Sequence, residues 1–255
     1  MDSASTASVR VVAVGGFQLF GELVDSLGIP RVPVAPVDAF ALVEADAGLE
    51  LRPPREADRS GIRALFPPNQ ETQVGRGRSP LAKAFGKKIT SVFDLTAGLG
   101  GDAYRLALAG YRVRGWERNP AVFALLSSAW TASVAQGRVP AELAERVAFH
   151  WGDGVAALEE FRGSALGAYF DPMYPRPQRR SALPKRAVQV LRSLLEVESE
   201  PTPLVVAARE RLSRVVVKRP HHAAPLVEGA SFAIETKLVR FDVYLNPARM
   251  ESADS

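Results

Sequence analysis

A glycine-rich segment at residues 94–102 lies between a predicted strand and a predicted helix. Gly98, Gly100 and Gly101 carry no Cβ atom, so the backbone of this turn can approach a bound ligand closely. Tight packing of the strand against the helix would explain the same glycines. Glu117 follows Gly98 by 19 residues, close to the spacing at which an acid accepts hydrogen bonds from ribose hydroxyls. The turn and the acid together predict a nucleoside site.

Asp102 indicates which nucleoside cofactor fits. A dinucleotide needs the spacing G-x-G-x-x-G, which places its pyrophosphate at the helix N-terminus. Here Asp102 occupies that end of the helix, where a carboxylate repels a pyrophosphate and suits a cation. S-adenosylmethionine is a cation without phosphate, so we expect it as the cofactor. Asp153, beside Gly154, can meet an adenine amino group, although a helix N-cap explains this residue nearly as well.

The segment Asp171-Pro172-Met173-Tyr174 follows the fourth predicted strand. An exocyclic amine of a base is a poor nucleophile because its lone pair is delocalised into the ring. A carboxylate and a backbone carbonyl that accept its two N–H bonds can aim the lone pair at a methyl group, and Pro172 fixes the turn that presents such a carbonyl. Tyr174 can stack on the base. In isolation the segment would be a proline turn beside a partly buried tyrosine. After a glycine turn and a ribose acid, we predict catalysis by Asp171, Pro172 and Tyr174.

The elements that must position these residues alternate after residue 79. We predict strands at 91–95, 112–116, 147–150, 168–170 and 214–218, helices at 81–85, 102–109, 120–134, 155–161, 185–195 and 204–212, and an antiparallel pair at 232–236 and 240–245. This order predicts an α/β fold with a Rossmann-like, doubly wound, mostly parallel sheet and an antiparallel C-terminal strand. Ligands of such sheets bind at the carboxyl ends of the strands.

The N-terminal part has a different pattern. A strand at 10–14, a helix at 17–26 and a hairpin formed by 40–44 and 49–52 predict a small α+β lobe over residues 1–70. We expect a linker from residue 53 to about 79 and assign residues 71–255 to the larger domain.

The composition limits the chemistry. The 255 residues contain no cysteine and three histidines, which excludes disulfides, thiol nucleophiles and cysteine-based metal sites and disfavours a histidine-based one. We therefore expect no metal. No apolar run approaches the length of a membrane span and the N-terminus does not resemble a secretory signal, so we expect no membrane partner and a cytoplasmic protein.

The net charge of +4 is unevenly distributed. Residues 1–70 hold six bases and nine acids, whereas the other 185 residues hold 26 bases and 19 acids. Three windows, 73–93, 172–195 and 211–227, contain bases but no acid. They can bridge a polyanion if they converge, although solvated faces would look the same.

Several segments together resemble the class I S-adenosylmethionine-dependent methyltransferases, and within them the RsmJ family of bacterial 16S ribosomal RNA guanine-N2 methyltransferases. The matching segments are 75–78, 94–102, 112–114 with 117–120, 171–175 with 181–183, 215–220 and 240–244. The resemblance covers about residues 75–245 and is loose over the N-terminal 70 residues. One departure is Gly101, where the family often has arginine, so that any cofactor contact there must come from the backbone.

The resemblance implies methyl transfer from S-adenosylmethionine to the N2 amine of a guanine in 16S ribosomal RNA, free or within the 30S subunit. The expected cofactor-binding residues are Asp94, Gly98, Gly100, Gly101, Asp102, Glu117, Arg118, Asp153, Gly154 and Asp171. The expected RNA-binding residues are Arg76, Arg78, Arg176, Arg179, Arg180, Lys185, Lys218 and Arg219.

Other functions fit parts of the pattern. The Asp-Pro-x-Tyr chemistry also serves methylation of adenine N6 or of a protein glutamine amide. An NAD-dependent dehydrogenase is disfavoured by the glycine spacing and Asp102. A non-catalytic RNA-binding protein is disfavoured because the full set of site residues is present.

Overall fold

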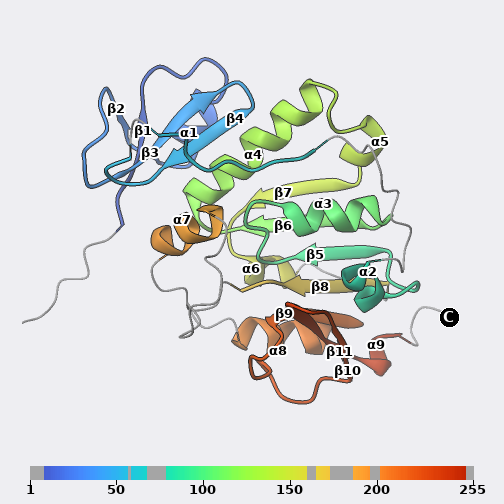
Figure 1. Ribbon diagram of the computed structural model, residues 1–255. Coiled ribbons are helices and arrows are strands. Elements are labelled where there is room, and N and C mark those ends of the chain that lie inside the picture. The colour runs from blue at the N-terminus through green and yellow to red at the C-terminus, as the bar shows by residue number, and fades with distance from the viewer. Residues whose placement is uncertain are drawn as a thin grey trace, which may run out of the picture.

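The computed structural model describes residues 9–56, 59–67, 79–159, 165–172, 186–195 and 202–250. Figure 1 shows a large sheet through the middle and lower part of the molecule and a small sheet at its upper left. Over the described residues, no helix is both long and apolar enough to cross a membrane.

Seven strands form the large sheet in the order β10-β11-β9-β8-β5-β6-β7. Neighbours from β9 to β7 are parallel, whereas β11 is antiparallel to both β9 and β10. The strands are β5 (Ser91–Asp94), β6 (Arg112–Glu117), β7 (Val147–Trp151), β8 (Leu166–Phe170), β9 (Arg214–Pro220), β10 (Phe232–Glu235) and β11 (Val239–Leu245). The predicted α/β class and Rossmann-like sheet are confirmed.

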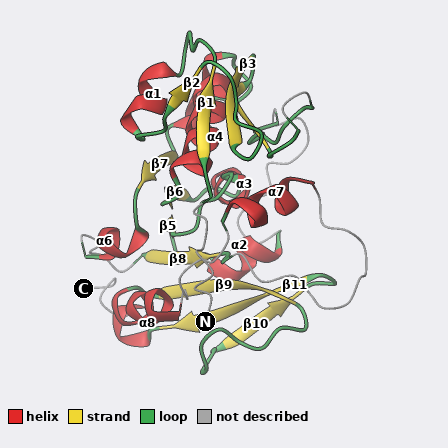
Figure 2. Ribbon diagram, turned by 90° about the vertical axis from the view of Figure 1, so that its left-hand side faces the viewer, coloured by secondary structure: helices red, strands yellow, loops and turns green. Residues whose placement is uncertain are grey.

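Helices pack on both faces of this sheet (Figure 2). One apolar cluster joins the sheet to α2 (Pro80–Phe85), α3 (Gly101–Leu108) and α4 (Pro120–Ala135). A second cluster on the other face joins it to α6 (Gly154–Leu158) and α8 (Thr202–Arg211). The shorter helices α5 (Ala141–Ala144) and α9 (Pro247–Met250) have no counterpart among the predicted elements, whereas α7 (Arg186–Leu194) was expected.

The start of α4 shows why the helix begins where it does. Asn119 is the N-cap, and its side-chain oxygen accepts hydrogen bonds from the N–H groups of Ala121 and Val122. Pro120 takes the first helical position, where its missing N–H costs nothing. Because α4 follows β6 directly, this cap also orients the end of β6.

The small sheet has the order β2-β1-β3-β4. Its elements are β1 (Val11–Val14), α1 (Gly21–Ser26), β2 (Arg31–Val32), β3 (Phe40–Ala45) and β4 (Gly48–Arg52), of which only the two-residue β2 was not predicted. Leu42 and Leu51 share an apolar cluster with Val122 and Leu125 of α4. The Leu49 N–H donates to Ser128 Oγ at 2.8 Å, which ties β4 to α4. The division at residue 70 is still a prediction.

The expected linker is wrong for the part of it that the structure describes. Ile62 pairs with Leu51 in an antiparallel bridge. Phe66 is 3% exposed and meets Trp130 and Phe149 with ring centroids 4.9 and 6.3 Å away. The prolines and arginines around residue 53 suggested a loop, but Ile62, Ala64 and Phe66 are buried in the core.

Candidate active site

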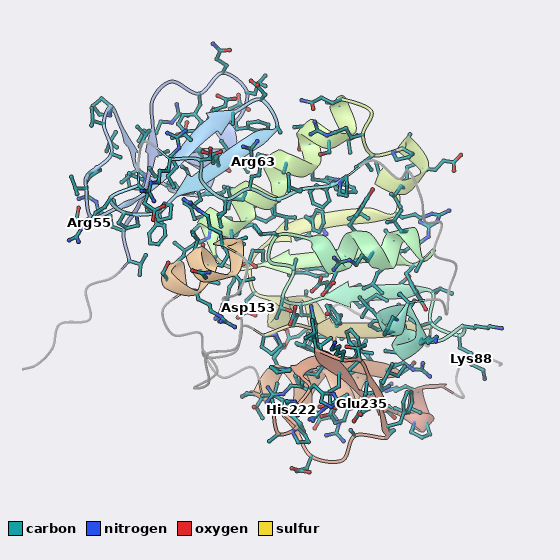
Figure 3. All side chains as sticks on the ribbon, viewed as in Figure 1. Arg55, Arg63, Lys88, Asp153, His222 and Glu235 are labelled. Carbon is teal, nitrogen blue, oxygen red and sulfur yellow. The ribbon has the colours of Figure 1, made fainter. Side chains whose placement is uncertain are left out.

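The carboxyl ends of the parallel strands bring charged side chains to one edge of the sheet. Asp94 ends β5 and Glu117 ends β6. The register of β8 with β9 places Asp171 and Lys218 at the next position of neighbouring strands. Figure 3 shows Asp153 near this edge and Lys88, which precedes β5, near the opposite one.

The backbone of the turn after β5 requires glycine at two positions. Gly98 and Gly100 have φ angles of 54° and 78°, in the left-handed region that favours glycine. A Cβ atom at Gly100 would also lie 2.5 Å from Leu126 Cδ1. At Gly101 a Cβ atom would meet nothing within 4 Å, so packing does not require this glycine. Packing therefore explains Gly100, while open space lies beside Gly101.

Glu117 ties the turn to the end of β6. Its Oε2 accepts a hydrogen bond from the Gly98 N–H at 3.0 Å, and its Oε1 accepts one from the Asn119 N–H at 2.7 Å. The residue is 9% exposed. The glycine turn and the acid are thus joined directly.

A network of hydrogen-bonded charges lies beside this turn. The Lys218 ammonium donates to Asp102 Oδ2 at 2.8 Å and to Asp171 Oδ2 at 2.7 Å. The Tyr169 hydroxyl also donates to Asp102 Oδ2, at 2.7 Å, and Arg105 donates to Asp102 Oδ1. One ammonium therefore joins the first turn of α3 to the end of β8.

Burial and charge perturb the titration of this edge. Burial raises the pKa of Asp94 well above its usual value, and nearby Asp102 raises it further. Burial also raises the pKa of Asp171, against the opposing effect of Lys218. For Lys218 burial lowers the pKa, but Asp171 and Asp102 outweigh burial and raise it overall, so this ammonium stays charged at neutral pH. Perturbed groups of this kind are typical of functional sites.

Thr96 positions Asp171 and was missed in the sequence. Its hydroxyl oxygen accepts a hydrogen bond from the Asp171 backbone N–H at 2.7 Å. The contact joins the loops that follow β5 and β8, which lie side by side in the sheet. A hydroxyl residue two positions after a strand-ending acid is the only local signal, because the partner is 75 residues away.

Lys218, which is expected to bind RNA, has its ammonium bound to two carboxylates of the site. Arg219, which has the same expected role, is held by a backbone carbonyl. It is 9% exposed, and its guanidinium donates two hydrogen bonds to the Ala224 carbonyl. These two hydrogen bonds hold the segment that follows β9 against the end of that strand.

Of the remaining predicted residues, the structure describes some, and the others lie outside the described residues. Arg118 and Asp153 are exposed after β6 and β7, and a Cβ atom at buried Gly154 would lie 2.8 Å from the Leu95 side chain. Pro172 is buried directly after Asp171. Tyr174, Arg76, Arg78, Arg176, Arg179, Arg180 and Lys185 lie outside the described residues.

Residues 27–246 match the family model described as SAM-dependent methyltransferase. The chain belongs to this family. It is 37% identical over 218 residues to the ribosomal RNA small subunit methyltransferase J of Haemophilus ducreyi, with 82% of this chain and 86% of that protein covered. The protein of the same name from Citrobacter koseri is 39% identical over 221 residues, with 83% and 87% covered.

A solved structure agrees with the assignment. The crystal structure of the SAM-dependent methyltransferase NGO1261 from Neisseria gonorrhoeae has a TM-score of 0.69 and 25% identity, and the match covers 92% of this chain and 96% of that one. The chain is thus an S-adenosylmethionine-dependent enzyme, and the dehydrogenase and non-catalytic alternatives are set aside. Among the described residues no histidine, aspartate and glutamate side chains are grouped so that they could hold a metal ion.

Proposed function

We propose that this methyltransferase modifies the N2 amine of a guanine in 16S ribosomal RNA, and that Asp171 and Pro172 orient that amine. The observation that carries the proposal is Asp171 at the end of β8, whose backbone N–H donates to Thr96 and whose carboxylate accepts a hydrogen bond from Lys218. Lys218 engages Oδ2, and Oδ1 has no hydrogen-bond partner among the described residues. Oδ1 is therefore the atom that accepts an N–H bond of the amine.

The ribosomal substrate is supported by the relatives that carry the name ribosomal RNA small subunit methyltransferase J. The proposed partner is 16S RNA, either free or assembled in the 30S subunit, and such a substrate calls for a cytoplasmic enzyme. Adenine N6 and a glutamine amide also present an N–H group to a carboxylate, so site chemistry alone does not separate these substrates.

The residues around the glycine turn fit S-adenosylmethionine as the cofactor. The edge holds the carboxylates of Asp94, Asp102, Glu117 and Asp171, with the ammonium of Lys218 between two of them. Such a surface favours a cation over a pyrophosphate. When bound, the cofactor would supply a methyl group that is activated by its positively charged sulfur, because the sulfur leaves as a neutral thioether.

We propose that two groups of residues hold this cofactor, the acids that contact its nucleoside and the glycine turn. Glu117 and Asp153 would bind its nucleoside, and the backbone of the glycine turn would contact it. The other expected contacts are Asp94, Gly98, Gly100, Gly101, Asp102, Arg118, Gly154 and Asp171.

The residues after β8 align the target amine with the methyl group. Proline fixes the backbone at position 172, and its carbonyl accepts the second N–H bond of the amine. Tyr174 stacks on the base.

Methyl transfer from tritiated S-adenosylmethionine tests the proposal. The substrates are 30S subunits and naked 16S RNA from cells that lack the gene, with DNA and total protein as alternatives. We expect label in the RNA and, after digestion, in N2-methylguanosine. Label in N6-methyladenosine or in protein would contradict the proposed substrate. Mass mapping of 16S RNA from the same cells should show one guanine that lacks a methyl group.

A further inference from the structure

One face of the large sheet is left open beside β6 and β7. On this face α6 and α8 share an apolar cluster with β5, β8 and β9. Figure 2 shows α6 and α8 on the side of the sheet away from α3 and α4, and no described helix lies beside β6 and β7 there. The cluster includes no residue of β7. A groove of about 400 Å³ crosses the open region, with Phe93 and Leu166 among its lining residues.

Three arginines line this groove, namely Arg112, Arg114 and Arg146. All three are exposed. No carboxylate of the described chain forms an ion pair with any of them, although Glu145 also lines the groove. The carboxyl-end edge of the sheet differs, because there the Lys218 ammonium is bound to two acids. Three guanidinium groups beside one carboxylate attract an anion with several charges.

Aromatic rings continue the same face toward the active-site edge. Trp116 follows Arg114 on the same side of β6, because side chains alternate along a strand. Its ring stacks on His150 of β7, with centroids 4.9 Å apart and an interplanar angle of 22°. Burial and the charge of Arg114 lower the pKa of His150, so this stack is uncharged at neutral pH.

We infer that this groove binds the sugar-phosphate backbone of an RNA strand, with a neighbouring nucleotide on the Trp116 and His150 rings. Guanidinium groups bind phosphate oxygens, and aromatic side chains stack on unpaired bases. β6 begins at Arg112 and ends at Glu117, so the groove and the proposed cofactor site lie about 17 Å apart along one strand. A single RNA segment of a few nucleotides can reach both around the end of β7.

The inference rests on the proposed RNA substrate and names three arginines that lie outside the three basic windows. It therefore predicts a difference between groove arginines and other exposed arginines. The test variant combines Arg112→Gln, Arg114→Gln and Arg146→Gln. The matched control combines Arg10→Gln, Arg55→Gln and Arg59→Gln, three exposed arginines of the N-terminal part with no ion pair among the described residues. Both variants lose the same charge.

Binding to in-vitro transcribed 16S RNA is measured by filter retention over a range of salt concentrations. We expect the groove variant to bind roughly tenfold more weakly near 0.1 M salt, and the slope of log K against log salt to fall by about 2 to 3. At saturating RNA its kcat should equal that of the unaltered protein, with a raised KM. Binding of S-adenosylmethionine, measured by calorimetry, should be unchanged and reports an intact fold.

Two outcomes would overturn the inference alone. Equal losses in the groove and control variants would mean that only net charge matters. Unchanged binding to naked RNA together with weaker binding to 30S subunits would assign the groove to an acidic ribosomal protein. If the unaltered protein methylates no RNA at all, the proposed function fails, whatever the groove variant does.

Discussion

The carboxyl-end edge of the large sheet and the open face of β6 and β7 use charge in opposite ways. At the edge, the acids are buried or partly buried and are held in place: Asp102 has three side-chain partners, and Glu117 accepts hydrogen bonds from two backbone N–H groups. On the open face, Arg112 and Arg114 are exposed and form no ion pair within the described chain. Groups that are held in advance lose little freedom when a reaction begins, whereas unpartnered cations favour the arrival of a polyanion. The difference separates a surface built for chemistry from one built for binding.

The largest effect should come from Asp171→Ala. Loss of the carboxylate that we propose to orient the amine should lower kcat by roughly 10³-fold, with a smaller loss of affinity for S-adenosylmethionine, because Asp171 is also an expected cofactor contact. Tritium transfer to 30S subunits measures the first quantity and calorimetry the second. Asp171→Asn is the matched variant, since it keeps the shape of the side chain and one acceptor oxygen. Normal turnover of Asp171→Ala would remove the chemical role from this edge.

Lys218→Met should destabilise the protein by about 2 kcal/mol near neutral pH, because two partly buried carboxylates lose their shared cation. The pKa of Asp102 in the folded protein lies below its usual value, as Lys218 and Tyr169 outweigh the effect of burial. This stabilisation is therefore present above the ordinary pKa of aspartate and is lost as the pH falls through the lowered value. Urea unfolding at several pH values measures it. Lys237→Met in the exposed turn before β11 should change nothing.

Glu117→Gln should weaken binding of S-adenosylmethionine by about tenfold. One amide oxygen can replace only one of the two acceptors that hold Gly98 and Asn119, and the amide NH₂ then faces an N–H group. Calorimetry of the variant checks the affinity. Glu142→Gln, an exposed acid on α5, is the control, and an equal loss there would show that overall charge sets the affinity.

Asp94→Asn should give the smallest effect, and it should raise the stability of the folded protein, whereas Lys218→Met lowers it. The raised pKa of Asp94 means that its charged form is disfavoured in the folded protein. Stability is consequently lost as the pH rises through the ordinary aspartate value, near 3.9. At pH 7 the variant should be more stable by about 1 kcal/mol, with a melting temperature about 2–4 °C higher, and the gain should vanish near pH 3. Its Oδ1 still accepts the Thr96 N–H. A less stable variant would mean that the Asp94 charge is compensated in the fold.

The sequence by itself determined the strands and most helices, because alternation, glycine turns and caps are local patterns. The Asn119 cap, the Gly98 turn and the acid at the end of β6 were all predicted and found. It also determined which acids lie at the carboxyl ends of the strands, since parallel strands place those ends at one edge of the sheet.

Only the tertiary structure decided which charges meet. Lys218 lies 116 residues from Asp102 and 47 from Asp171, and nothing in a basic window indicates that its ammonium turns toward two acids. The same holds for Arg219, which is buried, and for Arg112 and Arg114, which are not. The partners of a charge depend on strand order and on which sheet face a helix covers. Those are properties of the whole packed chain, because the energy of a charge depends on its burial and its nearest opposite charge.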